Sequence, residues 1–313
     1  MAELITWKAE FAAMAALLNI VGVGMISAFT ASASVDMKRP GSRFSYVTSN
    51  QITWIASLPS ITAIFGNLLS GYLSLKIGRN AGMYSVSVPT YIIEIATLKI
   101  RGFLGSCYHI TYATGVLIAM LLGITVRWSW LAIVGAFFST SATFFIFFIP
   151  ESPAWLIAND RHTEVVQSFQ FLKGDYVDSV SEANMVREHF TERPQKSVSL
   201  QEFKKPQLYK PIVLSIGLVF FQQFSGINAL MAYTVEIFEH AESSVDPSIA
   251  AAVVAGVQVI ATAFGGALMD KCGRTKLFTI SGIFVSFGLL TLGIYGILAK
   301  NCFWEQTLTA GFR

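Results

Sequence analysis

The stretch FAAMAALLNIVGVGMISAFTASASV, residues 11–35, decides the fold class because none of its 25 side chains is charged. A helix needs about 20 such residues to cross the hydrocarbon core of a bilayer. Lipid offers no hydrogen-bond partner to a backbone amide, so a crossing segment has to be helical. The stretch therefore predicts a membrane-spanning helix.

Six further uncharged runs of similar length follow along the chain. They are Phe44–Leu75, Gly102–Val126, Trp128–Pro150, Pro211–Val235, Pro247–Met269 and Leu277–Ala299. A shorter uncharged run, Asn80–Ile93, contains Pro89 and would rise only about 21 Å as a helix. Whether it crosses the bilayer is left open. The sequence predicts an all-α membrane protein with seven spans.

Composition supports the membrane class and excludes others. Hydrophobic residues make up 53% of the chain and charged residues 13%, whereas soluble domains carry about a quarter charged residues. The net charge of +3 is spread over short loops, so no basic stripe for nucleic acid is present. The three cysteines have no metal-type spacing, and no nucleophile-elbow, zinc-protease or P-loop motif occurs. We therefore expect no enzyme, no metal and no cofactor.

One loop pattern occurs twice, 195 residues apart, as GYLSLKIGRN from Gly71 and GALMDKCGRTK from Gly266. Such a repeat suggests two related halves. Glycine permits a tight turn, and Arg274 can pair with Asp270 or cap a helix end. We predict gating elements here; the alternative is a generic basic loop on the cytoplasmic side. The gating candidates in the two copies are Gly71, Gly78, Arg79, Asp270, Gly273 and Arg274.

Four segments resemble known signatures. The repeated loop resembles that of the major facilitator superfamily, with Leu75 where the family has aspartate. The run PESPAWL at 150–156 resembles the sugar-porter signature P-E-S-P-R-W-L, and EIATLKIRG at 94–102 resembles its E-x(6)-R-G element. The run QQFSGIN at 222–228 matches Q-Q-x-S-G-I-N, within a stretch similar to arthropod facilitated trehalose transporters.

The resemblance implies an incomplete major facilitator fold with two helical half-domains. The expected parts are an N-terminal half at 1–156 without the family's third helix, a cytoplasmic linker at 157–210, and a partial C-terminal half at 211–313. The last part would hold family helices seven to nine, without the last three. Within the linker, Arg161–Leu172 is expected to form an amphipathic helix.

The resemblance also implies a function: facilitated diffusion of trehalose or a hexose by alternating access. The carrier would be a multi-pass protein of the plasma membrane, with sugar and lipid bilayer as partners, and transport by this shortened form is expected to be impaired. The alternative is a non-transporting fragment or isoform that at most associates with full-length carriers.

Three uncharged amides are the main binding candidates: Gln222, Gln223 and Asn228. A buried amide needs hydrogen-bond partners, and its donors and acceptors match sugar hydroxyl groups without the desolvation cost of a charge. Ser225-Gly226 can break the helix between them and aim Gln223 and Asn228 into one cavity. The alternative is an amide clamp between helices. The resemblance favours contact with sugar hydroxyls.

The remaining candidates have plainer alternatives. His109 lies where many facilitative glucose transporters have a sugar-binding glutamine, but it can also be a buried histidine bonded to a neighbour. Tyr233 can stack on a sugar face or simply pack between helices. Glu94, Arg101 and Glu151 are expected to form a charge network at the cytoplasmic helix ends, with ordinary solvated loop charges as the alternative.

Overall fold

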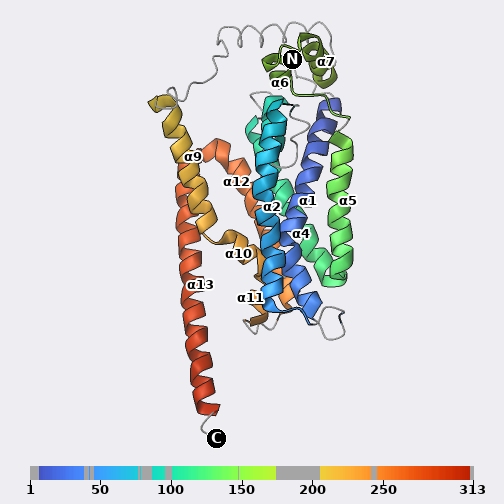
Figure 1. Cartoon of the computed structure of the whole chain (residues 1–313). Helices are drawn as coiled ribbons and strands as arrows, with labels where there is room; N and C mark the ends of the chain where they lie inside the picture. The colour runs from blue at the N-terminus through green and yellow to red at the C-terminus, as the bar shows by residue number, and fades with distance from the viewer. Residues whose placement is uncertain are drawn as a thin grey trace. The chain divides into compact units, whose positions relative to one another are not determined.

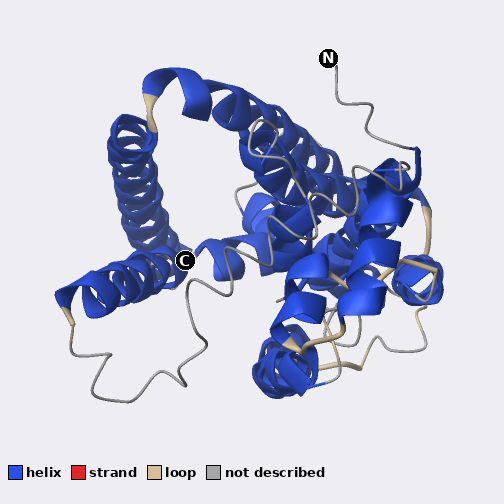
Figure 2. Ribbon diagram, turned by 90° about the horizontal axis from the view of Figure 1, so that it is seen from above, coloured by secondary structure: helices blue, strands red, loops and turns tan. Residues whose placement is uncertain are grey.

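The computed structural model describes residues 7–38, 42, 46–76, 78, 87–95, 101–146, 148–173, 205–240 and 245–310. Within these ranges the chain forms helices joined by turns and loops, and no strand (Figure 2). Within the described ranges, seven helical stretches are long and apolar enough to cross a membrane, and each overlaps one of the predicted runs. The predicted all-α membrane class is confirmed.

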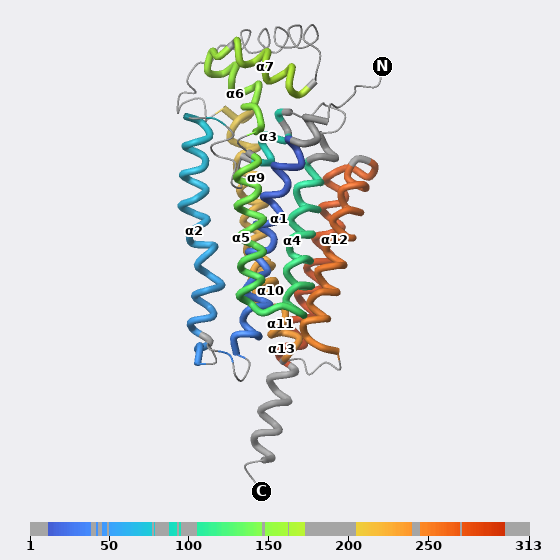
Figure 3. The backbone as a smooth tube through the Cα atoms, turned by 90° about the vertical axis from the view of Figure 1, so that its right-hand side faces the viewer, coloured from blue at the N-terminus to red at the C-terminus, as the bar shows by residue number. Residues whose placement is uncertain are grey.

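The helices follow one another along the chain and are labelled in Figure 1, except α3, which is labelled in Figure 3. They are α1 (Trp7–Lys38), α2 (Ser49–Lys76), α3 (Ser87–Ile95), α4 (Arg101–Thr125), α5 (Trp128–Ile146), α6 (Pro153–Ala158), α7 (His162–Lys173), α9 (Pro206–Phe224), α10 (Ile227–Ala232), α11 (Thr234–His240), α12 (Pro247–Cys272) and α13 (Arg274–Ala310).

The chain divides into two compact units, Met1–Thr262 and Ala263–Arg313. The first holds α1 to α11 and most of α12. The second holds the end of α12 and α13, whose apolar side chains, such as Phe284 and Phe287, are exposed. The halves predicted at 1–156 and 211–313, and the linker between them, rest on the repeat and stay a prediction.

Close packing of α1 against α4 and α5 forms the centre of the first unit (Figure 3). Glycines make this approach possible: a Cβ on Gly24 would strike the carbonyl oxygen of Tyr112, and one on Gly115 would strike that of Val21. Small residues at helix contacts are typical of membrane bundles, where backbones approach closely to gain dispersion energy. The α1–α4 contact is therefore fixed by the backbones themselves.

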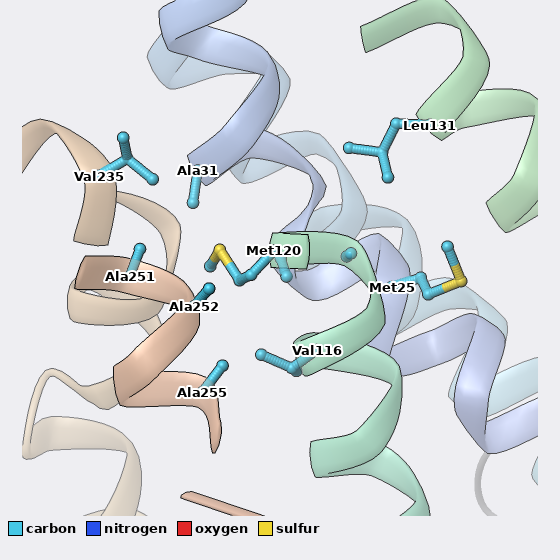
Figure 4. Close-up of a cluster of buried hydrophobic side chains, with 11 residues drawn as sticks. Met25, Ala31, Val116, Met120, Leu131, Val235, Ala251, Ala252 and Ala255 are labelled. Atoms are coloured by element: carbon cyan, nitrogen blue, oxygen red, sulfur yellow. The ribbon is translucent and has the colours of Figure 1, made fainter. Parts of the chain in front are cut away.

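A cluster of buried apolar side chains extends this centre to α11 and α12 (Figure 4). Met25 and Ala31 come from α1, Val116 and Met120 from α4, and Ala252 from α12. Most members are alanine, valine or methionine, which fill narrow spaces between helices. The first part of α12 is in this way packed onto the same centre as α1 and α4.

The helix ends differ from several predicted boundaries. The second span begins at Ser49 rather than Phe44, and the fifth predicted run is broken into α9, α10 and α11. In the doubtful run Asn80–Ile93, α3 includes residues 87–93, and residues 80–86 lie outside the described part. The amphipathic helix expected at Arg161–Leu172 is confirmed as α7, which buries Val165, Ser168 and Leu172.

Candidate functional site

A cavity of about 640 Å³ opens between α1, α2, α4 and α10 in the first unit. Among the residues that the structure describes, no charged side chain lines this cavity, and the lining is mainly apolar with hydroxyl and amide groups in between. Its wall consists of Val23, Ile26, Ser27, Thr30, Ala56, Pro59, Ser60, Thr62, Ala63, Gly66, Asn67, Leu69, Ser70, Leu73, Tyr112, Asn228, Met231 and Ala232. Its size is within the range of ordinary small-molecule pockets, and its chemistry suits a neutral polar ligand.

The break between α9 and α10 brings one predicted amide into this wall. Gly226 has φ +80°, a left-handed conformation that favours glycine. The hydroxyl of Ser225 donates to the carbonyl oxygen of Gln222 at 2.6 Å and so satisfies one carbonyl at the end of α9. The helix break predicted from Ser225-Gly226 is confirmed, and it places Asn228 on α10 at the cavity.

Asn228 is held by a second predicted amide. Its Nδ2 donates to Oε1 of Gln223 at 2.7 Å across the break. Gln223 itself is exposed and is not part of the cavity wall, and the same holds for Gln222. The structure thus brings Gln223 and Asn228 together, with Asn228 at the cavity and Gln223 as its support. Sugar contact by any of the three amides stays a prediction.

The other two binding candidates lie elsewhere. His109 is exposed on α4, with its ring edge-on to that of Tyr108 at 5.1 Å between centroids, and it does not line the cavity. Tyr233 follows α10, and its hydroxyl donates to Oγ1 of Thr53 on α2 at 3.4 Å. This contact ties the α10–α11 junction to α2. A role of His109 or Tyr233 in binding stays a prediction.

The longest wall of the cavity comes from α2, which sequence reasoning did not single out. Its lining residues recur at helical spacing, with Ser60, Ala63, Asn67 and Ser70 on one face. The available signal was this stripe of small and polar residues in an otherwise apolar span.

A second group of predicted residues meets at the α6 end of the first unit. We call Gly78, Glu94, Glu151, Ser152 and Trp155 the end cluster. The hydroxyl of buried Ser152 donates to Glu94, and the indole Nε1 of Trp155 donates to the carbonyl oxygen of Leu75 at 3.2 Å. Gly78 has φ +137°, and a Cβ there would overlap the carboxylate of Glu151. The positive φ favours glycine at this position, and any larger residue would also displace the end of the Glu151 side chain.

Tyr91 packs into the end cluster from α3, which is not among the seven candidate spans. Burial, and after it the negative charges of Glu151 and Glu94, raise the pKa of the Tyr91 hydroxyl well above its usual range. The hydroxyl stays protonated and donates to the carbonyl oxygen of Pro150 at 3.1 Å. The loop before α6 is therefore fastened to α3 by a neutral hydrogen bond.

The remaining gating candidates are only partly covered. Arg79 lies outside the described residues, as do the side chains of Arg101 and Asp270. Gly71 lies within α2, and Gly273 joins α12 to α13 with φ +82°. Arg274 is exposed at the start of α13. The predicted pairing of Arg274 with Asp270 and the gating roles stay predictions.

At the opposite end of α1, two polar contacts reach distant segments. The ammonium of Lys38 lies 2.9 Å from a carboxylate oxygen of Glu236 on α11. Asp36 accepts a hydrogen bond from the backbone N–H of Trp128 at 2.9 Å, at the first turn of α5. An acidic side chain at a helix N-terminus is favourable, because the backbone N–H groups there have no partner within the helix.

Within the described ranges, no three His, Cys, Asp or Glu side chains are grouped as a metal site would need.

Comparison with known proteins gives a family model described as "Sugar (and other) transporter", which matches residues 77–311. That family consists of transporters rather than enzymes, in agreement with the sequence prediction.

Curated relatives match most of the chain. The bovine facilitated glucose transporter member 8 of solute carrier family 2 is 29% identical over 93% of this chain and 66% of its own length. The facilitated trehalose transporter Tret1 of Culex quinquefasciatus is 29% identical over 95% of this chain and 65% of its own length. The chain thus spans about two thirds of the length of these relatives, and 42% of the Anopheles gambiae Tret1.

Among solved structures, the xylose transporter XylE from E. coli, in a partially occluded inward-open conformation, matches with a TM-score of 0.64. The match covers 85% of this chain and 74% of the other at 18% identity, which supports the major facilitator fold and no more. With the family model covering 77–311, the chain belongs to the sugar transporter family, and its helices adopt the major facilitator fold.

Proposed function

We propose that this chain carries a neutral sugar, trehalose or a hexose, across the plasma membrane by facilitated diffusion. The observation that carries the proposal is the uncharged cavity with Asn228 in its wall, held by Gln223 across a helix break. A broken helix beside a cavity exposes polar groups within the membrane without exposing them to lipid. The names of the glucose and trehalose transporters that resemble the chain point to the same ligand class.

The cavity chemistry favours sugar over an ion. Its polar lining consists of hydroxyl and amide groups, which both donate and accept hydrogen bonds as sugar hydroxyls do. An ion would lose its hydration energy on entering such a cavity without a countercharge. Alternating access would move α2 and α10 against the packed α1–α4 wall, and we expect transport to be slower than that of a full-length relative.

Uptake by the purified full chain in proteoliposomes tests the proposal, with radiolabelled trehalose and glucose as substrates and mannitol as a non-substrate. Saturable uptake, competed by unlabelled sugar, is expected. Asn228→Ala should weaken sugar binding by about fivefold to tenfold, the value of one net hydrogen bond. Gln207→Ala is the matched control, because Gln207 is an exposed amide on α9 away from the cavity.

Two results would contradict the proposal: no saturable uptake of either sugar, or equal apparent affinities for Asn228→Ala and the unchanged chain. The protein's fold is checked in parallel by its circular dichroism and its elution volume in detergent. Fluorescence from a fused reporter at the cell surface, rather than at internal membranes, tests the location.

The second candidate function is a non-transporting form that associates with full-length carriers. It is favoured by the exposed apolar side chains of α2 and α9, among them Trp54, Phe65 and Phe221, in a chain shorter than its relatives. Co-purification with a tagged full-length relative, without uptake by the chain alone, would support it. An unrelated multi-pass protein serves as the control, since exposed apolar faces also bind lipid.

A further inference from the structure

The helix α2 is packed at its two ends and little supported between them. Its buried side chains are Ile52 near the N-terminal end and Ser70 and Ser74 near the C-terminal end. Of residues 53–69, all of which the structure describes, none has a buried side chain. This middle part rises about 25 Å along the helix axis. Side-chain packing therefore holds α2 mainly at its ends.

The two ends of α2 are also bonded to different elements. Near one end, the hydroxyl of Tyr233, between α10 and α11, donates to Oγ1 of Thr53 at 3.4 Å. Near the other end, the indole Nε1 of Trp155 in α6 donates to the carbonyl oxygen of Leu75 at 3.2 Å. These two points on α2 are about 33 Å apart. Movement of α2 as a rigid rod would strain at least one of the contacts, whereas bending of its middle would strain neither.

Pro59 lies in this middle part and in the cavity wall. Proline has no N–H group, so the carbonyl oxygen of Ile55 lacks the donor that an α-helix would supply from four residues further on. Thr62 Oγ1 donates to the carbonyl oxygens of Leu58 and Pro59, both at 3.0 Å. Such bonds from a threonine to the preceding turn often bend a helix. The backbone of α2 is therefore easiest to bend beside the cavity.

The two walls that face each other here can respond differently. The cavity side of the middle part carries the small residues Ser60, Ala63 and Gly66, so α2 can bend inward with little steric resistance. The α1–α4 wall cannot yield in the same way, because a Cβ on Gly24 would already strike the carbonyl oxygen of Tyr112. A change in the width of the cavity is therefore expected from α2.

We propose that α2 is a cover that bends at Pro59 and closes the cavity over its ligand while both of its ends stay in place. The inference rests on the proposed function only for the identity of the ligand. It adds which segment moves and where the helix bends. A cover that moved as a rigid rod would instead break the Tyr233–Thr53 or the Trp155–Leu75 contact.

Electron–electron distance measurements on the purified full chain in nanodiscs test the bending directly, with the three native cysteines replaced by serine. One spin-label pair joins Ile64, exposed in the middle of α2, to Phe137, exposed on α5; the other joins Leu75, at the end of α2, to Phe137. Addition of trehalose or glucose should shift the first distance and leave the second unchanged. Pro59→Ala should narrow the first distance distribution even without sugar and abolish the shift.

Uptake and stability give a second, independent reading of the same variant. Alanine restores the missing N–H group, so Pro59→Ala should raise the thermal midpoint and yet slow sugar uptake several-fold. Pro59→Gly restores the N–H group but keeps the local backbone freedom, and should retain more uptake than Pro59→Ala. Pro211→Ala is the matched control: it also removes a proline from inside a helix, α9, but lies outside the cavity wall and should not slow uptake.

Each contrary outcome has its own meaning. Equal widths of the Ile64–Phe137 distribution with and without Pro59, or unchanged uptake by Pro59→Ala, overturn the inference while the proposed function stands. Slower uptake together with a lower midpoint also overturns it, because damage to the fold rather than lost bending then explains the variant. If the unchanged chain takes up neither sugar, the proposed function fails, and the width of the distribution without sugar still decides whether α2 bends at Pro59.

Discussion

The two walls of the cavity are built differently. In α1, 50% of the residues in the most apolar stretch are buried. This helix meets α4 at Gly24 and Gly115, where the two backbones are in contact. In α2 the corresponding share is 6%, and neither Gly66 nor Gly71 has a heavy atom of another element near its Cβ position. One wall is fixed by backbone contact and the other by a few side-chain contacts such as Tyr233–Thr53. This difference in packing would allow the α2 wall to move while the α1–α4 wall keeps its shape.

The largest expected effect breaks the fixed wall. Gly115→Ala places a methyl group against the carbonyl oxygen of Val21, so α1 and α4 must separate. Overpacking of this kind costs about 1–3 kcal/mol and occasionally more. We expect a lower thermal midpoint and a smaller monodisperse peak in detergent. Gly217→Ala on exposed α9 is the control, since nothing lies within 4 Å of its added methyl group.

If Gly217→Ala were as damaging as Gly115→Ala, the difference between packed and exposed helices would not hold in the membrane. An unchanged midpoint for Gly115→Ala would show that the α1–α4 contact is looser than its geometry indicates. The control should stay within about 0.5 kcal/mol, because alanine also favours the helix over glycine.

The next effect compares two glycines of the same loop motif. Gly78→Ala must both keep φ +137° and displace the Glu151 carboxylate, so we expect a loss of about 1–3 kcal/mol. Gly71→Ala lies in helix α2 with open space at its Cβ position and should be neutral or slightly stabilising. Thermal unfolding monitored by tryptophan fluorescence separates the two. Equal midpoints would contradict a structural role for the end cluster.

Sequence alone predicted what depends on local composition. The spans follow from the absence of charge, and the break at Gly226 follows from glycine's freedom at positive φ. The sequence predicted that Gln223 and Asn228 both face one cavity, whereas of the two only Asn228 is in the cavity wall. That depends on the rotation of α9 and α10 about their axes, which tertiary packing sets. The α2 wall was missed for the same reason, because periodicity identifies a face but not its partner.

The end cluster shows the same division. The run at 150–156 predicted a structural element, and the structure gives its contacts: Ser152 to Glu94 and Trp155 to Leu75. No sequence signal indicated that an indole would satisfy a carbonyl at the end of α2. A pair 80 residues apart is brought together only by the fold.

A smaller effect tests that indole contact. Trp155→Phe keeps most of the buried ring but removes the donor to the Leu75 carbonyl oxygen. The expected loss is about 1 kcal/mol, one net hydrogen bond, together with some lost packing. Unfolding of the variant is compared with that of Trp130→Phe, whose ring is exposed on α5 and should matter less. A larger loss of stability in Trp130→Phe than in Trp155→Phe would contradict a stabilising role for the Trp155 hydrogen bond.

The smallest effect concerns the ion pair between Lys38, at the C-terminal end of α1, and Glu236 on α11. The Lys38–Glu236 pair is partly exposed, with 41% of the Lys38 side chain and 19% of the Glu236 side chain accessible, so it should contribute under about 1 kcal/mol. A double-mutant cycle with Lys38→Met and Glu236→Gln isolates the coupling. Salt should weaken this coupling, because mobile ions screen exposed charges.

The pair Arg161–Glu164 within one helix turn is the matched comparison. Both coupling energies should be small. Only loss of the Lys38–Glu236 pair should make α1 near Lys38 more accessible to a water-soluble label, because this pair joins segments 198 residues apart. Unchanged labelling would mean that α11 is held to α1 by the apolar cluster around Val235 rather than by charge.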